Sequence, residues 1–131
     1  MSHFARVKTL MREREKVREA LRQLDYQYEE GECLIRGWSQ SERAEIKIPG
    51  QSYDIGLRQR DGVYEVVADW WGVARDGVLG RRVVSQEQFV GEVTQRYSYL
   101  TAVELLEESG YQVVEERDEE GELVLEAVRY Y

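Results

Sequence analysis

The chain has 131 residues, of which 42% are hydrophobic and 34% charged, a composition that predicts one globular domain over residues 1–131. Eighteen basic and 26 acidic residues give a formal net charge of −8. No apolar run approaches the length that crosses a bilayer and the N-terminus has no apolar signal core, so we expect a cytoplasmic protein without a membrane span.

The first half of the sequence predicts a strand, a helix and a short hairpin. The segment from His3 to Lys8 is expected to be a strand. Thr9 is the predicted N-cap of a helix over 10–24, in which Leu10, Val17, Leu21 and Leu24 recur at helical spacing. Residues 26–28 and 33–36 then flank an acidic turn with Gly31 and are expected to pair as a hairpin.

The middle of the chain predicts more strands and a long loop. Residues 44–48 alternate and stop at Pro49-Gly50. Residues 53–58 and 63–70 flank Asp61-Gly62, a strong hairpin signal because both residue types tolerate a positive φ. The glycine-containing stretch 71–84 is expected to be a loop.

A long helix and a last hairpin are predicted for the remainder. Ser85 and Gln88 form a capping box, and apolar residues follow at steps of three and four up to Leu106. A second potential cap at Thr101 leaves open a bend near Ser98. Gly110 is placed to end the helix, and residues 111–116 and 123–128 are expected to form a hairpin.

Two stretches of the sequence resemble each other. Each leaves a helix, passes Tyr-Gln and reaches a Glu-Gly pair before an apolar strand (residues 21–38 and 106–130). This predicts an α+β fold, an antiparallel sheet with two main helices, and suggests two pseudo-symmetric helix–hairpin halves.

The charges are unevenly distributed. Residues 1–24 carry seven basic and three acidic residues, whereas residues 101–131 carry ten acidic and two basic ones. The acids inside the first helix break up its basic cluster, so nucleic-acid binding is not expected. The oppositely charged ends are either an ordinary solvated surface or an attraction between segments, including those of two copies in a homo-oligomer.

Few side chains offer catalytic or metal-binding chemistry. His3 is the only histidine and Cys33 the only cysteine, which excludes a two-histidine metal site within one chain. His3 has two alternatives to a local structural role: a titrating group near neutral pH, or a copper or nickel ligand together with a retained N-terminus. Cys33 is expected to be a small core residue. We therefore predict no cofactor and no dedicated metal site.

Two carboxylates stand among apolar neighbours. Asp54 lies at the start of a predicted strand, and Asp69 is predicted at the end of another, on the face shared with Val63, Glu65 and Val67. The alternative to a site is that both acids lie on an outward strand face or face a turn. A buried carboxylate needs a partner, for which Arg58 or Arg96 are candidates. Arg96, beside Tyr97 on the long helix, is either such a partner or a ligand for an anion.

Trp70-Trp71 is the most unusual local feature. In a strand these two side chains would point to opposite faces, so at most one enters the core. The other is expected to be exposed beside the glycine-containing loop, and exposed aromatic residues are typical of partner surfaces. The alternative is that the loop or the long helix covers both.

Several motifs occur together in order: Met1-Ser2-His3-Phe4, Lys8-Thr9, Tyr53-Asp54-Ile55-Gly56, Val66-Val67-Ala68-Asp69, Thr94-Gln95-Arg96-Tyr97, and Gly110 to Glu115. With them the chain resembles the hypothetical chloroplast reading frame thirty-five family, a domain of unknown function of cyanobacteria, some plastids and other bacteria. The resemblance implies a cytoplasmic or stromal protein and supplies no catalytic residue. The stretch from Gly72 to Arg82 is longer than the family pattern leads us to expect.

Two functions follow as hypotheses. The first is a non-catalytic protein-interaction or complex-assembly module that acts through Trp70, Trp71 and the adjoining loop, with the basic first helix as a further candidate contact. The alternative is a small-ligand-binding protein or enzyme whose pocket gathers His3, Asp54, Asp69 and Arg96, next to Tyr97.

Overall fold

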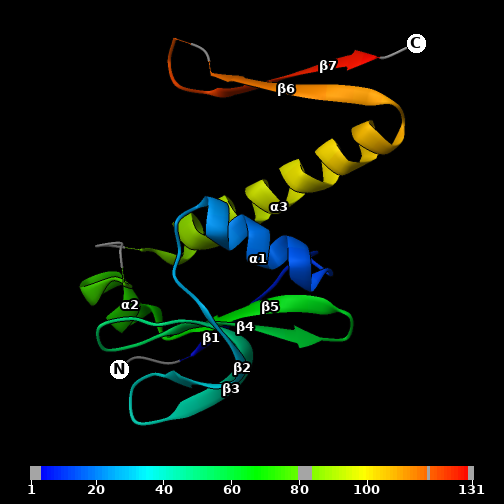
Figure 1. Ribbon diagram of the computed structural model, residues 1–131. Coiled ribbons are helices and arrows are strands. Elements are labelled where there is room, and N and C mark those ends of the chain that lie inside the picture. The colour runs from blue at the N-terminus through cyan, green and yellow to red at the C-terminus, as the bar shows by residue number, and fades with distance from the viewer. Residues whose placement is uncertain (1–3, 80–83, 118, 130–131) are drawn as a thin grey trace. The chain divides into compact units, whose positions relative to one another are not determined.

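The computed structural model describes residues 4–79, 84–117 and 119–129 of the chain. The fold comprises two compact units, unit 1 over Met1–Tyr97 and unit 2 over Ser98–Tyr131. Helices and strands are mixed, with a larger antiparallel sheet in unit 1 (Figure 1). The predicted α+β class is confirmed.

Unit 1 contains a five-stranded sheet in the order β1-β5-β4-β3-β2. Every neighbouring pair is antiparallel. Val66 of β5 lies opposite Val7 and Leu57, and Leu57 lies opposite Ile46, so these apolar residues share one face. The strands are β1 (Ala5–Lys8), β2 (Glu29–Arg36), β3 (Ser41–Ile48), β4 (Ile55–Arg60) and β5 (Val63–Ala68).

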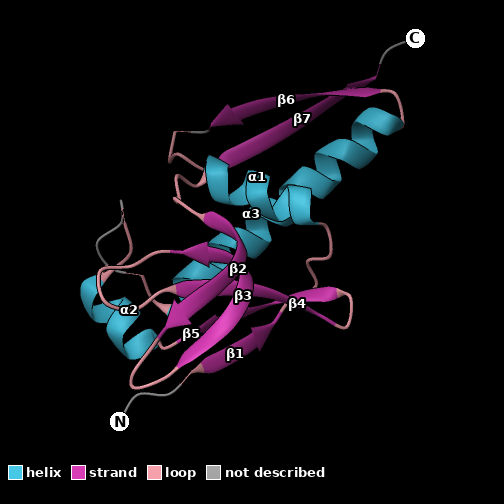
Figure 2. Cartoon of the chain, turned by 60° about the horizontal axis from the view of Figure 1, so that its bottom comes forward, coloured by secondary structure: helices cyan, strands magenta, loops and turns pink. Residues whose placement is uncertain are grey.

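Two helices supply the other half of this core. Helix α1 (Arg14–Gln23) buries Val17, Ala20 and Leu21. Helix α3 (Gln86–Glu108) buries Phe89 and Val93 in its first two turns. The helix α1 and the first turns of α3 stand over the sheet (Figures 1 and 2). Removal of this apolar surface from water is the main driving force for folding of unit 1.

The β2–β3 hairpin lies over the face of the sheet that carries Arg58 and Glu65. A Cβ atom at Gly56 would stand 2.6 Å from Cγ1 of Ile35, so the isoleucine occupies the space that any other residue would need. Glu42 of the hairpin forms ion pairs with Arg6 and Arg58, and Arg58 also donates to Glu65 at 2.6 Å. These ion pairs offset charges that the hairpin covers, although the buried Oε2 of Glu42 makes no hydrogen bond with the described residues.

The start of the first helix differs from the prediction. Thr9 does not cap it: the Thr9 hydroxyl donates to the carbonyl of Tyr64 at 2.6 Å and accepts from the Met11 amide. The helix begins at Arg14, with Glu13 at the N-cap position. Residues 9–11 instead form an irregular segment in which Met11 is buried.

The first predicted hairpin is also wrong in its turn. Gly31 lies inside the continuous strand β2, next to the register shift between Glu30 and Cys33, and residues 37–40 make the turn to β3. The Glu-Gly pair at 30–31 therefore sits in a bulge, whereas Gly121 lies between β6 and β7 with φ 84°. In both halves a helix leads into a hairpin, but the two Glu-Gly pairs occupy different places.

The first part of the stretch 71–84, which was expected to be a loop, belongs to a further short helix. Strand β5 ends at Ala68, and α2 (Trp70–Asp76) follows with Asp69 at its N-cap. Gly77, with φ 77°, ends the helix. Residues 80–83 of this stretch lie outside the described residues. The end of β5 at Ala68 also means that Asp69 is not a strand residue sharing a face with Glu65.

Helix α3 is continuous from Gln86 to Glu108, without the interruption considered near Ser98. The Ser85 hydroxyl accepts the Gln88 amide at 3.1 Å, which confirms Ser85 as the cap, whereas the Gln88 side chain donates to Glu92 at 3.3 Å and does not complete the predicted box. Gly110 with φ 88° follows the helix end as predicted. In unit 2 the helix leads into β6 (Tyr111–Arg117) and β7 (Leu123–Arg129), which pair as a separate two-stranded sheet.

Candidate functional site

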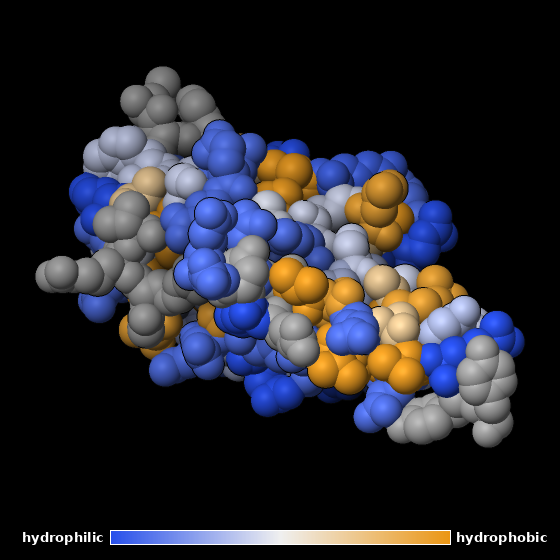
Figure 3. Space-filling model, turned by 90° about the horizontal axis from the view of Figure 1, so that it is seen from above, coloured by the Kyte–Doolittle hydropathy of each residue, from blue (hydrophilic) through white to orange (hydrophobic). Residues whose placement is uncertain are grey.

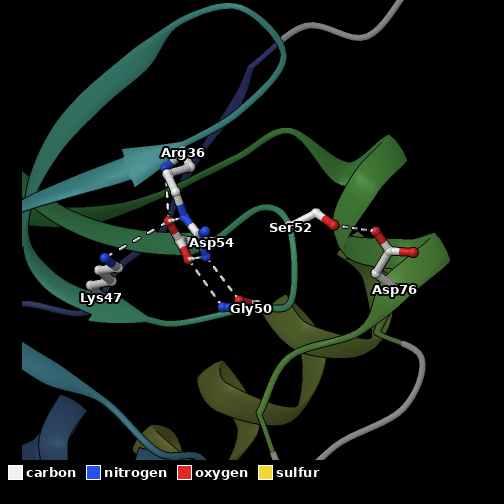
Figure 4. Close-up of polar contacts among 6 residues, drawn as sticks. All are labelled: Arg36, Lys47, Gly50, Ser52, Asp54 and Asp76. Atoms are coloured by element: carbon white, nitrogen blue, oxygen red, sulfur yellow. Dashed lines mark hydrogen bonds and ion pairs between the residues drawn. The ribbon is translucent and has the colours of Figure 1, made fainter.

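Asp54 is fully buried and is held by one arginine and the loop that follows β3. Nε of Arg36 donates to Oδ2 at 2.9 Å, and a terminal guanidinium nitrogen of Arg36 donates to Oδ1 at 2.8 Å. The backbone amides of Arg36 and Gly50 donate to the same carboxylate at 2.9 and 3.0 Å (Figure 4). Nζ of Lys47 stands 3.9 Å from Oδ2.

Two opposing effects set the pKa of Asp54. Burial alone would raise the pKa, but the hydrogen bonds from the Arg36 side chain and from the two backbone amides lower it below the ordinary value of 3.8. The carboxylate is therefore ionised at neutral pH, and every donor around it is engaged in holding the β2, β3 and β4 ends together. This arrangement gives Asp54 a structural role in the packing of these strand ends.

Asp69 is buried in the same way but with fewer partners. Its Oδ2 accepts the backbone amide of Trp38 at 3.0 Å, and its Cβ lies 3.2 Å from where a Cβ at Gly37 would stand. Its Oδ1 makes no hydrogen bond with the described residues, and neither does the buried Nε1 of Trp70. Asp69 thus ties the turn after β2 to the start of α2, without using its side chain as a helix cap.

The two adjacent tryptophans separate as predicted into a more buried and an exposed one, although they do so on a helix. The Trp70 ring packs against Phe89, with ring centroids 6.0 Å apart. Trp71 keeps 56% of its surface exposed. Because successive helical residues point about 100° apart, the first turn of α2 can present one ring to the core and one to solvent.

Trp71 is held in place although it is exposed. The Arg75 guanidinium lies over its ring at 4.3 Å from the centroid, and the Tyr53 ring is 6.5 Å away. Arg75 is in turn paired with Asp76, which accepts the Ser52 hydroxyl at 2.7 Å. We call Tyr53, Trp71 and Arg75 the α2 surface. The charge of Arg75 is balanced by Asp76, so this surface offers mainly aromatic ring faces for contact.

Close packing supports the α2 surface from below. A Cβ at Gly72 would stand 1.9 Å from Cδ2 of Tyr53, so the tyrosine ring lies directly on the helix backbone. The loop that carries Tyr53 is fastened at Gly50, which bridges to Val78 and accepts a hydrogen bond from Arg36 at 2.8 Å. Trp38, 54% exposed, follows Gly37 at the turn that Asp69 holds.

The long-helix candidates serve other contacts. The Tyr97 hydroxyl accepts the backbone amides of Arg12 and Glu13, at 3.1 and 3.0 Å, and so caps the start of α1 from another helix. Arg96 donates to the Gln23 side chain at 3.4 Å. The partners proposed for the carboxylates were wrong, since Arg36 holds Asp54 and Arg58 pairs with Glu42 and Glu65.

Three of the four residues predicted for the alternative ligand pocket lie among the described residues. Asp54 bonds to Arg36 and Gly50, Asp69 to Trp38, and Arg96 to Gln23. Each is thus engaged with different neighbours, while His3 lies outside the described residues. The described part of the chain contains no group of three or more His, Cys, Asp or Glu placed to hold a metal ion.

Cys33 is half-buried on β2, and its thiol lies 3.9 Å from the Glu29 carbonyl oxygen. Burial raises its pKa, and the negative charge of Glu29 adds to this effect. A raised pKa disfavours the thiolate, which is the nucleophilic form.

Among the described helices, none is both long and apolar enough to span a membrane.

Comparison with known proteins adds a family to this geometry. Residues 20–125 match the model of the family described as "Protein of unknown function (DUF1257)". The chain belongs to this family. A DUF1257 relative in Guillardia theta, "Uncharacterized protein ycf35", is 28% identical over 128 residues, covering 95% of this chain and 93% of the relative. The resemblance drawn from the motifs is confirmed. No solved structure matches the chain.

Three residues of the DUF1257 chain at this site were not predicted from its sequence. Arg36 is the last residue of β2, Trp38 lies in the turn that follows, and Tyr53 lies in the loop before β4, all far from α2 in sequence. The sequence does contain one indication for Trp38: it is a large aromatic residue in a Gly-Trp-Ser turn, and turns run over the protein surface. Nothing local distinguishes Arg36 from other arginines.

Proposed function

We propose that this protein is a non-catalytic interaction module whose α2 surface docks on another protein. The observation that carries the proposal is Trp71: a large aromatic side chain, more than half exposed, and held in a fixed position by Arg75 and Tyr53. Tryptophan, tyrosine and arginine are the residues that most often dominate binding energies at protein interfaces. Preorganised rings also lose little conformational freedom on binding.

The nature of the surface indicates the kind of partner. Arg75 is neutralised by Asp76 and Arg36 by Asp54, so the surface offers aromatic faces and aliphatic edges and little net charge. The fitting partner is a folded protein with an apolar patch, found in the compartment that we predict for this chain, the cytoplasm or the plastid stroma. The described polar groups nearby bind each other and offer no base or nucleophile for a reaction.

The test is quantitative capture of partners with the full chain and with Trp71→Ser. We expect proteins retained by the wild type to fall about tenfold in the variant, because loss of a central aromatic contact costs about 1.4 kcal/mol or more. Binding of the captured protein, once purified, should weaken to the same extent by calorimetry.

The matched control is Leu10→Ser, which removes an apolar side chain that is 88% exposed and lies outside the α2 surface. This variant should keep the wild-type partners. Both variants should keep the wild-type circular dichroism spectrum and unfolding midpoint, since neither side chain is buried. Identical partners for wild type and Trp71→Ser would refute the proposal.

A further inference from the structure

The sheet of unit 2 has only two strands among the described residues. Strands β6 and β7 form a two-stranded sheet, whereas two-stranded hairpins in isolation are marginally stable in water. In unit 1 the hairpin that follows α1 continues into a wider sheet, because β3 also pairs with β4. Among the described residues no further strand pairs with β6 or β7.

One face of this hairpin is lined with valines. Val128 lies opposite Gln112, and Val114 lies opposite Glu126. Val124 and Val128 share the face with Glu126 because strand side chains alternate with a period of two. Val114, Val124 and Val128 are all exposed, and we call them the valine face. Figure 3 shows hydrophobic side chains among hydrophilic ones on the face of the molecule that is seen from above.

Unit 2 as a whole is strongly acidic, and one acid, Glu126, lies on the valine face itself. Unit 2, Ser98–Tyr131, contains ten acidic and two basic residues. Both basic side chains are occupied within the hairpin: Arg117 donates to the Gly121 carbonyl at 3.0 Å, and Arg129 lies over the Tyr111 ring at 5.5 Å. Glu126 on the valine face makes no ion pair with any described residue.

We propose that the valine face of unit 2 is a second docking surface, which binds a basic segment of another protein. Hydrophobic side chains of that segment pack on Val114, Val124 and Val128, and its Lys and Arg residues pair with Glu126 and the surrounding acids. Burial of the valines supplies the affinity, and the charges supply selectivity and the rate of encounter.

Charge decides between this occupant and others. A second copy docking with the same face would bring a net charge of −8 against −8, which opposes association. Nucleic acids and anionic membrane surfaces carry the same sign as unit 2 and are repelled as well. A basic protein segment is the occupant for which both the apolar centre and the acidic surroundings are favourable.

The test uses the full chain and defined labelled peptides, with binding followed by fluorescence anisotropy. The probe alternates lysine and valine; one control peptide has serine in place of valine, and another has glutamate in place of lysine. We expect the lysine–valine peptide to bind, the lysine–serine peptide to bind about tenfold more weakly, and the glutamate–valine peptide not to bind. Binding should weaken as salt is raised.

Variants locate the binding site. The double variant Val124→Ser with Val128→Ser should weaken binding of the lysine–valine peptide about tenfold. Glu126→Gln should weaken it less and reduce its salt dependence. Leu34→Ser, an exposed leucine on β2, is the control and should bind as the wild type does. Trp71→Ser should also bind normally, so that failure of this proposal is distinct from failure of the proposed function.

Five outcomes overturn the proposal. Equal binding of the lysine–valine and lysine–serine peptides would mean that the valines contribute nothing. No binding of the probe, or equal binding by wild type and the double valine variant, would remove the site. A wild-type dimer that the valine substitutions dissociate would make a second copy the occupant. A large fall in the unfolding midpoint of the valine variant would show that the chain itself covers the face.

Discussion

The guanidinium of Arg36 and the carboxylate of Asp54 face each other edge to edge, with paired hydrogen bonds of 2.9 and 2.8 Å. Arg36 ends β2 and Asp54 precedes β4, so this pair joins two strands that are not neighbours in the sheet. The same arginine also holds Gly50. One residue thus fixes the loop from which Tyr53 reaches Trp71.

Asp54→Asn should lower the free energy of unfolding by about 3 kcal/mol, because it replaces a buried, paired charge with a neutral amide and leaves Arg36 without its counterion. Urea unfolding measures the change. Asp61→Asn, in the β4–β5 turn at φ 54°, is the control and should have little effect, since asparagine tolerates this conformation.

The Asp54 contribution should depend on pH in one direction. Its folded pKa is below the ordinary 3.8, so the stabilisation is complete above the unfolded pKa and is lost as the pH falls through the folded pKa. The stability difference between wild type and Asp54→Asn should therefore shrink on acidification below 3.8. A difference that stays constant there would contradict the ion pair.

Tyr97→Phe should destabilise unit 1 by about 1 kcal/mol, because the start of α1 loses the acceptor for two backbone amides. Faster hydrogen exchange at the Arg12 and Glu13 amides would localise the effect. Tyr28→Phe is the matched control, since the Tyr28 hydroxyl makes no hydrogen bond with the described residues. Equal effects of the two substitutions would exclude Tyr97 as the cap.

Two glycine-to-alanine substitutions should have opposite signs. Gly72→Ala places a methyl group into the Tyr53 ring and should cost about 1–3 kcal/mol. Gly91→Ala meets open space inside α3 and should stabilise by about 0.5–1 kcal/mol through helix propensity. Thermal unfolding compares them, and the intrinsic tryptophan fluorescence, to which Trp71 contributes, should change with Gly72→Ala alone.

Cys33 should react slowly with iodoacetamide near neutral pH, since burial and the Glu29 charge raise its pKa and reduce the thiolate fraction. Glu29→Gln should increase the rate by removing one of these causes. The measurement is the rate of alkylation by intact mass. A rate above that of a cysteine-containing peptide would instead indicate an activated thiol.

Short sequence patterns predicted the turns and helices that depend on neighbouring residues alone. Asp61-Gly62 forms the β4–β5 turn with φ values of 54° and 81°, and the spacing from Phe89 onward gives α3. Helix α2 was missed because seven residues give too short a period to recognise and its sequence contains a glycine. The Glu-Gly pair at 30–31 misled because the same dipeptide suits a turn and a bulge.

For the candidate site, the sequence predicted some properties of single residues but not their partners. Exposure of one tryptophan of the Trp70-Trp71 pair followed from their adjacency. The apolar neighbours of Asp54 and Asp69 singled out these two acids, but an outward or turn-facing position was also expected for them, and both are buried. Their partners did not follow: Arg36 and Trp38 approach only when the β2–β3 hairpin folds. Such pairings depend on the tertiary arrangement, which no short-range pattern contains.

Gly56 has a consequence beyond its own contact with Ile35 and Ala44. Any larger residue there would lift the hairpin off the strands beneath it and open the salt-bridged layer to water. Selection for glycine at this position would therefore report on architecture alone. Across relatives of the chain, substitutions at Trp71 or Val128 would trace changes of partner, while Gly56 would stay fixed whatever that partner is.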